Sequence, residues 1–243
     1  MNDNTSCDIQ IAITGSGGAG SITAGELLLS LAGKNGCFGI MRRSFGPQIR
    51  GGEAAALVRI GHRPIECMSD SFDLWLALDW QNADRFADEI ALRPDSLIIA
   101  DPAAGAIPDR ITELGPAIIE VPMKALAKEV ELGRPNMVAL GLLGHWLDYC
   151  GDEAGRLIEH VFSRKGADIV SGSLAAFDKG FTEPVIIDAR AAHGGPGSCD
   201  RENSGQRWDL SGNEGCGLGA VRGGIRFAAA YPITPASDLL EWL

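Results

Sequence analysis

The chain has 243 residues, with 32 acidic side chains against 21 Lys and Arg, and a formal net charge of −11. This acidity argues against broad binding to nucleic acid or to an anionic membrane, because phosphates would be repelled over most of the surface. Glycine, with 32 residues, is nearly twice as frequent as its usual share of about 7%, which predicts many tight turns and close backbone approaches.

The first ten residues, MNDNTSCDIQ, are polar and acidic. They contain neither the basic region nor the apolar stretch of a signal peptide. Further along the chain, charge or glycine interrupts every apolar window well short of a membrane-spanning length. We therefore expect a cytoplasmic protein with no membrane partner.

A strand, a glycine-rich turn and a helix are predicted next. Residues 8–14 (DIQIAIT) predict a short buried strand, and residues 21–32 predict a helix with an apolar inner face. Between them lies GSGGAG, in which Gly15, Gly17 and Gly20 satisfy the pattern G-x-G-x-x-G. In this context the pattern is typical of a loop that holds a phosphate against the N-terminus of a helix. A tight turn with nothing bound is an equal alternative.

The middle of the chain alternates short apolar runs with helix-length connections. One short apolar run covers residues 37–41, and further strands are predicted at residues 53–60, 74–78, 97–100 and 117–121. Three successive helices are predicted at residues 136–150, 153–163 and 169–179. This order predicts an α/β fold, with a Rossmann-like, mostly parallel sheet that has helices on both faces.

A basic cluster follows the first helix. Within residues 34–63, six Lys and Arg residues stand beside a single acid. Arg42 and Arg43 occupy the place where an NAD-binding fold usually has the acidic residue that binds the ribose. The segment FGPQIRGG (residues 45–52) predicts a sharp turn that presents Arg50. Because arginine forks suit phosphate, the cluster favours a phosphorylated small ligand, with a solvated or subunit-facing surface as the alternative.

The composition changes after residue 190. The sequence AAHGGPGSCDRENSGQR has almost no apolar content beyond alanine, which predicts a flexible linker over residues 191–209. We therefore expect residues 1–190 to form one domain and residues 210–243 to begin a second α/β domain.

A helix, a turn and a helix are predicted after the linker. Residues 212–230 are helix-like, YPITP at residues 231–235 is a turn whose prolines fix φ around Thr234, and Ser237 can cap a last helix. By chemistry alone, this turn suits a plain helix entry as well as a carboxylate site. The last helix ends with unburied apolar residues, so we expect the rest of the second domain to lie outside this sequence.

The residue types that bind metals are scattered along the chain. The six cysteines include no C-x-x-C pair, and the four histidines form no H-E-x-x-H or other close pattern. We expect reduced thiols and neither a zinc nor an iron–sulfur site in this chain.

Four sequence blocks, in this order, resemble the 2-oxoacid:ferredoxin oxidoreductases: GSGGAG, SFGPQIRGGEAAALVRI, the linker, and GNEGCGLGAVRGGIRFAAAYPITPAS. The chain looks like the subunit in which a gamma domain is fused ahead of the alpha domain, which holds the pyrimidine side of thiamine diphosphate. The resemblance implies oxidative decarboxylation of a 2-oxoacid, with coenzyme A (CoA) as co-substrate and ferredoxin as electron acceptor. Thiamine diphosphate supplies the carbanion chemistry. We expect 2-oxoglutarate as the first candidate substrate and pyruvate as the next.

The resemblance also assigns roles to residues of this sequence. Thr234 would contact the substrate carboxylate, in a pocket shaped by Tyr231, Pro232, Ile233 and Pro235. The gamma domain would help to hold CoA, through a set of glycines and arginines in the first two blocks: Gly15, Gly17, Gly18, Gly20, Arg42, Arg43, Arg50, Gly51 and Gly52.

Other parts of the family's machinery have no counterpart in this sequence. The glutamate that activates thiamine diphosphate lies, in the family, well after YPITP. The diphosphate and magnesium site and the iron–sulfur cluster belong to a partner beta subunit. The resemblance therefore implies that the chain turns over only with the rest of alpha and with beta.

Two other interpretations also fit parts of the sequence. An NADP-binding reductase, with Arg42 and Arg43 on the ribose phosphate, explains the glycine pattern and the missing acid but leaves YPITPAS unexplained. A scaffold subunit would dock the rest of an enzyme while this chain binds neither ligand.

Overall fold

The structure is a computed structural model, and it describes residues 8–46, 52–81, 83–193, 208–234 and 236–243. The chain divides into two compact units, Met1–Gly205 (unit 1) and Gln206–Leu243 (unit 2).

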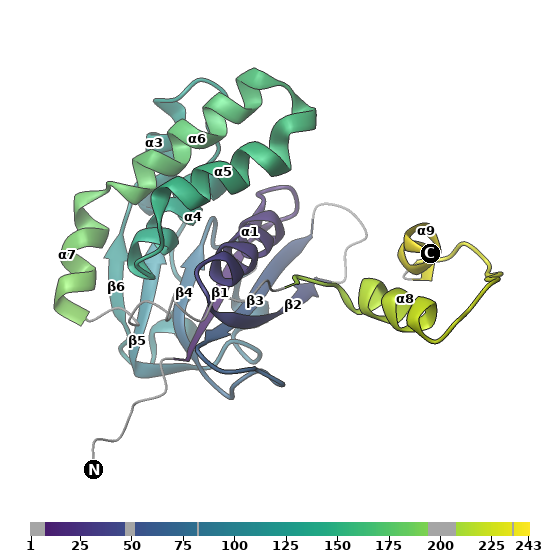
Figure 1. The fold of residues 1–243 in the computed structure, drawn as a ribbon. Coiled ribbons are helices and arrows are strands. Elements are labelled where there is room, and N and C mark those ends of the chain that lie inside the picture. Colours follow the sequence, from purple (N-terminus) through teal and green to yellow (C-terminus); the bar gives the residue numbers. More distant parts are fainter. Residues whose placement is uncertain (1–7, 47–51, 82, 194–207, 235) are drawn as a thin grey trace, which may run out of the picture. The chain divides into compact units, whose positions relative to one another are not determined.

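Unit 1 is built on a six-stranded sheet with the order β2-β3-β1-β4-β5-β6 (Figure 1). β1, β4, β5 and β6 pair in parallel, whereas β3 is antiparallel to both of its neighbours. The connection between β2 and β3 is short, and a short connection joins only antiparallel strands. The strands are β1 (Ile9–Ser16), β2 (Phe38–Phe45), β3 (Glu53–Gly61), β4 (Phe72–Ala77), β5 (Leu92–Ala100) and β6 (Ala117–Glu120).

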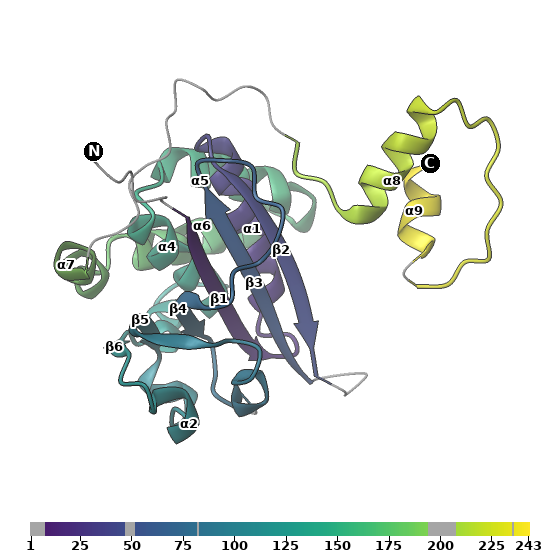
Figure 2. The same cartoon turned by 90° about the horizontal axis from the view of Figure 1, so that it is seen from below.

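Helices cover both faces of this sheet, which confirms the predicted α/β class. α1, α4, α5 and α6 lie over one face, and the short α2 lies on the opposite side (Figures 1 and 2). The helices of unit 1 are α1 (Ser21–Lys34), α2 (Asp109–Thr112), α3 (Met123–Lys128), α4 (Pro135–Trp146), α5 (Gly151–Phe162), α6 (Ala167–Phe181) and α7 (Pro184–His193), with 3₁₀ turns η1 (Ala83–Phe86), η2 (Pro102–Ala104) and η3 (Ser163–Lys165).

The two-residue period of the strands divides the core into two clusters. In β1, Ile11 and Ile13 join the cluster beneath the long helices, whereas Ala12 joins the cluster on the other face. In β4, Trp75 lies in this second cluster and donates its indole N–H to Thr14 at 2.8 Å. β1 is thus buried on both faces, which explains its nearly continuous apolar sequence.

Glycines bring α4 and α6 into direct backbone contact. A Cβ on Gly141 would lie 2.1 Å from the Phe177 carbonyl oxygen, and a Cβ on Gly180 would lie 2.0 Å from the Val138 carbonyl oxygen. Nearly every residue of α4 is buried. This close packing fixes the position of α4, and therefore of its N-terminus, above the sheet.

Several predicted boundaries in unit 1 were wrong. β2 continues through Arg42 and Arg43 to Phe45, because an edge strand tolerates exposed charge on its open side. The predicted linker begins too early, since α7 extends through His193.

Cys37 is disulfide-bonded, against the expectation of reduced thiols, while Cys67, Cys150 and Cys216 are free. Scattered spacing in a sequence does not show which cysteines meet in space.

Unit 2 consists of α8 (Gly212–Arg222) and α9 (Ala236–Trp242). The predicted helix over residues 212–230 ends early, because Gly224 takes φ +86°, a value that favours glycine and ends a helix. Ser237 lies inside α9 and not at its cap. Among the described residues of both units, no helix is long and apolar enough to cross a membrane.

Candidate functional site

The glycine-rich segment forms the turn between β1 and α1, as its pattern predicts. β1 extends through Ser16, so the turn itself is Gly17–Gly20. Gly18 and Gly20 have φ of +92° and +89°, in the region that other residues rarely adopt. Gly15 lies inside β1, where a Cβ would meet neighbouring side chains at 3.0 and 3.2 Å. The glycines therefore serve both the sharp turn and its close packing.

The N-terminus of α1 is open. Its cap residue is Gly20, and the described residues provide no side-chain cap; the first turn carries no acid. The hydroxyl of Ser21 donates to the carbonyl of Ala54 at 3.2 Å. The first N–H groups of a helix have no partner within the helix and form the positive end of its dipole. This end of α1 therefore suits an anion.

The N-terminus of α4 lies beside that of α1. Asn136, in the first turn of α4, donates from Nδ2 to the Gly20 carbonyl at 3.3 Å. A Cβ on Gly20 would lie 2.4 Å from that nitrogen, so only glycine permits the approach. In α4 too, the first turn has no acid and the described part of the chain supplies no capping side chain. Two positive helix ends thus converge at one place.

A cleft of about 390 Å³ opens at these two helix ends. Gly17–Gly20 and the first turns of α1 and α4 form one part of its wall. The end of β2, the beginning of β3 and parts of α5, η3 and α6 form the rest. The antiparallel register explains why β3 contributes, since it places Glu53 beside Ser16 at the end of β1.

Two cations among the described lining residues of the cleft were not predicted from the sequence. Arg134, the cap residue of α4, is exposed and has no carboxylate partner among the described residues. Lys165 lies over the ring of Phe162, with Nζ 4.8 Å from the ring centroid. Both lie far from the glycine turn in sequence, and only the fold brings them to it.

Two residues that line the cleft each have a buried side-chain oxygen without a partner among the described residues. Asn136 is 6% exposed and Glu53 is 3% exposed. Glu53 Oε1 accepts from Arg85 Nη1 at 2.7 Å, but Glu53 Oε2 and Asn136 Oδ1 have no hydrogen-bond partner in the described structure. Buried polar atoms are nearly always hydrogen-bonded, so each of these two oxygens has unused capacity to accept a hydrogen bond.

The predicted arginines are placed differently. Arg42 is ion-paired with Glu89, and Arg43 is paired with Glu26 at 2.6 Å; both arginines are exposed, and neither lines the cleft. Arg50 and Gly51 lie outside the described residues. Phe45 and Gly52, which flank their segment, both line the cleft. The structure thus brings together Gly17, Gly18, Gly20 and Gly52, but not Arg42, Arg43 or Gly15.

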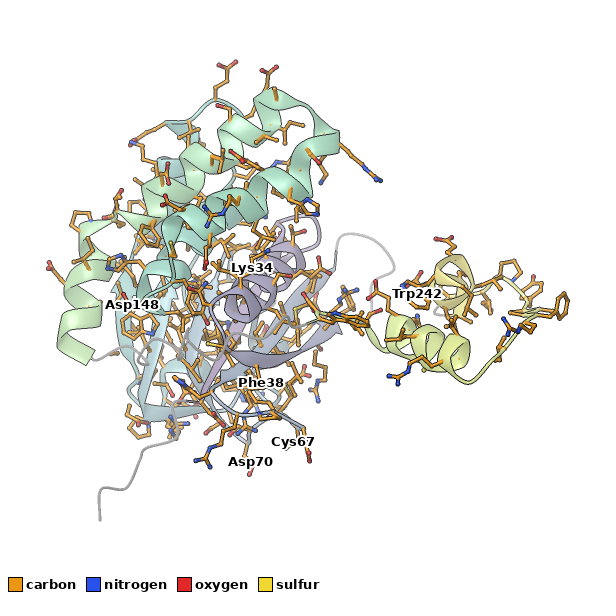
Figure 3. All side chains as sticks on the ribbon, in the orientation of Figure 1. Lys34, Phe38, Cys67, Asp70, Asp148 and Trp242 are labelled. Carbon is orange, nitrogen blue, oxygen red and sulfur yellow. The ribbon has the colours of Figure 1, made fainter. Side chains whose placement is uncertain are left out.

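Unit 2 carries the second group of predicted site residues. Tyr231, Pro232, Ile233 and Thr234 are exposed in the segment that leads into α9, and Pro235 lies outside the described residues. Figure 3 labels Trp242 of α9, whose ring lies against α8 so closely that a Cβ on Gly217 would be 2.3 Å from it. Across the described residues of the chain, no group of three or more His, Cys, Asp or Glu is arranged to hold a metal.

Comparison with protein families identifies the chain. The model of the pyruvate ferredoxin/flavodoxin oxidoreductase family matches residues 10–183. The chain belongs to this family. The match covers the sheet, the glycine turn and the cleft, and it confirms the resemblance inferred from the sequence blocks at the level of the family.

Solved structures of the family have the same fold. A 2-oxoglutarate:ferredoxin oxidoreductase from Magnetococcus marinus, with 2-oxoglutarate, coenzyme A and succinyl-CoA bound, is 29% identical, with a TM-score of 0.81 over 97% of this chain. This chain spans 40% of the length of that protein chain. A comparison with curated proteins found no match.

Two single subunits in the family share the fold at lower identity. The gamma subunit of a keto/oxoacid ferredoxin oxidoreductase from Geobacter sulfurreducens is 24% identical, with a TM-score of 0.59 over 75% of this chain and 98% of its own length. The pyruvate oxidoreductase subunit PORC from Thermotoga maritima is 19% identical, with a TM-score of 0.57 over 72% of this chain and 95% of its own length.

Proposed function

We propose that this chain is the gamma–alpha part of a 2-oxoacid:ferredoxin oxidoreductase, and that its cleft binds CoA, the acyl acceptor. The observation that carries the proposal is the convergence of two uncapped helix N-termini, those of α1 and α4, on one cleft with Arg134 and Lys165. CoA carries a pyrophosphate and a 3′-phosphate, which suit two positive helix ends and nearby cations. The CoA bound in the Magnetococcus enzyme supports this choice.

The size and composition of the cleft agree with part of CoA. Small-molecule clefts commonly measure about 300–1,000 Å³, and this one measures about 390 Å³. Gly17, Gly18 and Gly20 leave the backbone uncovered, so a phosphate can approach its N–H groups closely. We assign Arg50 and Gly51 to the same site, because Phe45 and Gly52 on either side of their segment line the cleft.

Residues 1–190 correspond in this proposal to the gamma domain, residues 191–209 to the linker and residues 210–243 to the start of the alpha domain. Thiamine diphosphate, when bound with magnesium at the junction with a beta subunit, supplies the decarboxylation chemistry. In this chain Thr234 would hold the carboxylate of the substrate through its hydroxyl. Its exposed position in the segment before α9 leaves that hydroxyl accessible.

The proposed substrate is 2-oxoglutarate, with pyruvate second. The Magnetococcus enzyme supports 2-oxoglutarate, since its structure contains that 2-oxoacid and succinyl-CoA. The proposed partners are a beta subunit that carries the iron–sulfur cluster, and ferredoxin as the electron acceptor. The NADP-binding alternative loses its main support, because Arg42 and Arg43 are paired with glutamates outside the cleft.

The test uses the assembly of this chain's full protein with its beta subunit. We expect reduction of a viologen dye that requires both the 2-oxoacid and CoA. In a parallel calorimetric titration of the chain itself, we expect CoA to bind at lower concentration than NADPH. Tight NADPH binding without a response to CoA, or dye reduction that ignores CoA, contradicts the proposal.

A further inference from the structure

One residue of the cleft has the wrong charge for an anion site. Glu53 lines the cleft beside the glycine turn, at the start of β3. Glu53 is 3% exposed, and the protein uses only one of its two carboxylate oxygens: Oε1 accepts from Arg85 Nη1 at 2.7 Å. Oε2 has no partner in the described structure. A purely structural ion pair does not require that the second carboxylate oxygen of a residue that lines the cleft be buried without a partner.

A second acceptor from a different element shares this property. Asn136 uses its amide nitrogen to hold Gly20, while its Oδ1 is buried without a partner among the described residues. Glu53 and Asn136 come from β3 and α4, and both line the same cleft. The cleft therefore combines positive helix ends with two orphaned hydrogen-bond acceptors, and a ligand made only of phosphate leaves both acceptors unsatisfied.

We infer that the cleft recognises hydrogen-bond donors next to the ligand's phosphates, and that Glu53 is the specificity residue that accepts from an N–H or O–H of the ligand, with Asn136 as the second acceptor. The inference rests on the proposed function, in which this ligand is CoA. CoA offers such donors in its adenine amine and in the hydroxyl and amides of its pantetheine arm. A simple anion such as sulfate carries charge and no donor.

The sign of one mutational effect separates recognition from plain charge. If Glu53 acts only through its charge, its removal makes the cleft more positive, and every anion binds more tightly. If Glu53 accepts a hydrogen bond from the ligand, the variant Glu53→Met loses affinity for CoA by about tenfold or more, since bonds to charged acceptors are strong. Sulfate, with no donor, gains affinity or does not change.

The experiment is calorimetric titration of the full chain with CoA and, separately, with sulfate, in buffer containing EDTA. Wild type, Glu53→Met and Glu53→Gln are compared, together with the control Glu129→Gln, which removes an exposed acid paired with Lys179 outside the cleft. Thermal melting checks that each variant folds. Glu53→Gln retains the shape and one acceptor oxygen, so it is expected to bind CoA better than Glu53→Met.

Weaker CoA binding with unchanged or tighter sulfate binding in Glu53→Met supports the inference. Equal or tighter CoA binding in both Glu53 variants overturns it while the proposed function stands. A loss of CoA affinity that appears only when Mg²⁺ is added also overturns it, because the carboxylate would then serve a cation. If wild type binds no CoA, the proposed function and this inference fall together.

Discussion

The contact between Gly20 and Asn136 gives the sharpest test of how the cleft is built. Gly18 and Gly20 have nearly the same positive φ, +92° and +89°. They differ in surroundings: a Cβ on Gly18 meets nothing within 4 Å, whereas a Cβ on Gly20 lies 2.4 Å from Nδ2 and 2.7 Å from Cγ of Asn136. Gly18→Ala is therefore a matched control for Gly20→Ala, with a similar positive φ and no clash.

The magnitudes follow from these two differences. A side chain in left-handed backbone costs roughly 1–2 kcal/mol, so Gly18→Ala is expected to lower the free energy of unfolding by about that amount. Gly20→Ala adds an overpacking cost of roughly 1–3 kcal/mol, for a total of about 2–5 kcal/mol. In the double variant with Asn136→Ala, the clashing amide is gone, and the extra cost of Gly20→Ala should largely disappear.

The assay is urea unfolding of wild type, the three single variants and the Gly20→Ala, Asn136→Ala double variant. The expected result is a double-mutant cycle with a coupling free energy of about 1 kcal/mol or more, in which Asn136→Ala relieves Gly20→Ala. If Gly20→Ala costs no more than Gly18→Ala, or if Asn136→Ala brings no relief, the helix ends of α1 and α4 do not meet as described.

Three further predictions concern charge, pH and the second unit. Arg134→Ala and Lys165→Ala should each weaken CoA binding several-fold in calorimetry. Arg42→Ala and Arg43→Ala should leave CoA affinity unchanged, because neither residue lines the cleft and each variant removes only an exposed ion pair worth about 0–1 kcal/mol. Equal losses of affinity in all four variants would contradict the assignment of the cleft. Burial raises the pKa of Tyr149, so above about pH 10 the phenol ionises in the unfolded chain before it does so in the folded one. The free energy of unfolding should therefore fall above that pH by up to about 1.4 kcal/mol per pH unit. A Tyr149→Phe variant that loses stability just as steeply would refute this. Ser211 caps α8 by accepting from the N–H of Glu214 at 3.2 Å, and Glu214 accepts in return from Ser211 N–H at 2.7 Å. Ser211→Ala should therefore destabilise unit 2 by about 0.5–2 kcal/mol and reduce its helicity, measured by circular dichroism. Unchanged helicity would show that the cap is not formed.

The sequence predicted those parts of the fold that depend on local pattern. The buried strand β1, the glycine turn and α1 were identified because period and glycine spacing are local signals. The run EAAALVRI identified β3 as a strand but not its antiparallel direction. The antiparallel direction of β3 follows from the short connection between β2 and β3. The length of this connection was not apparent from the sequence, because Arg42 and Arg43 interrupt the apolar run and obscure the end of β2.

The cleft was only half predictable for a related reason. The glycine turn was found from its own spacing, but its partners Arg134, Asn136 and Lys165 lie more than a hundred residues further along the chain. One local signal existed: Arg134-Pro135-Asn136 places proline at the first position of a helix, which marks a helix N-terminus. Arg42 and Arg43 were predicted to lie at the site because the charge of the basic cluster was counted without Glu26 and Glu89, which the fold places beside these arginines.

A crystal structure of the chain grown with CoA would show whether the cleft is the CoA site. We expect phosphate density at the converging N-termini of α1 and α4, within hydrogen-bond reach of backbone N–H groups in the turn Gly17–Gly20 and of Arg134. CoA bound at another surface of the chain, with these helix ends occupied only by water, would contradict this expectation.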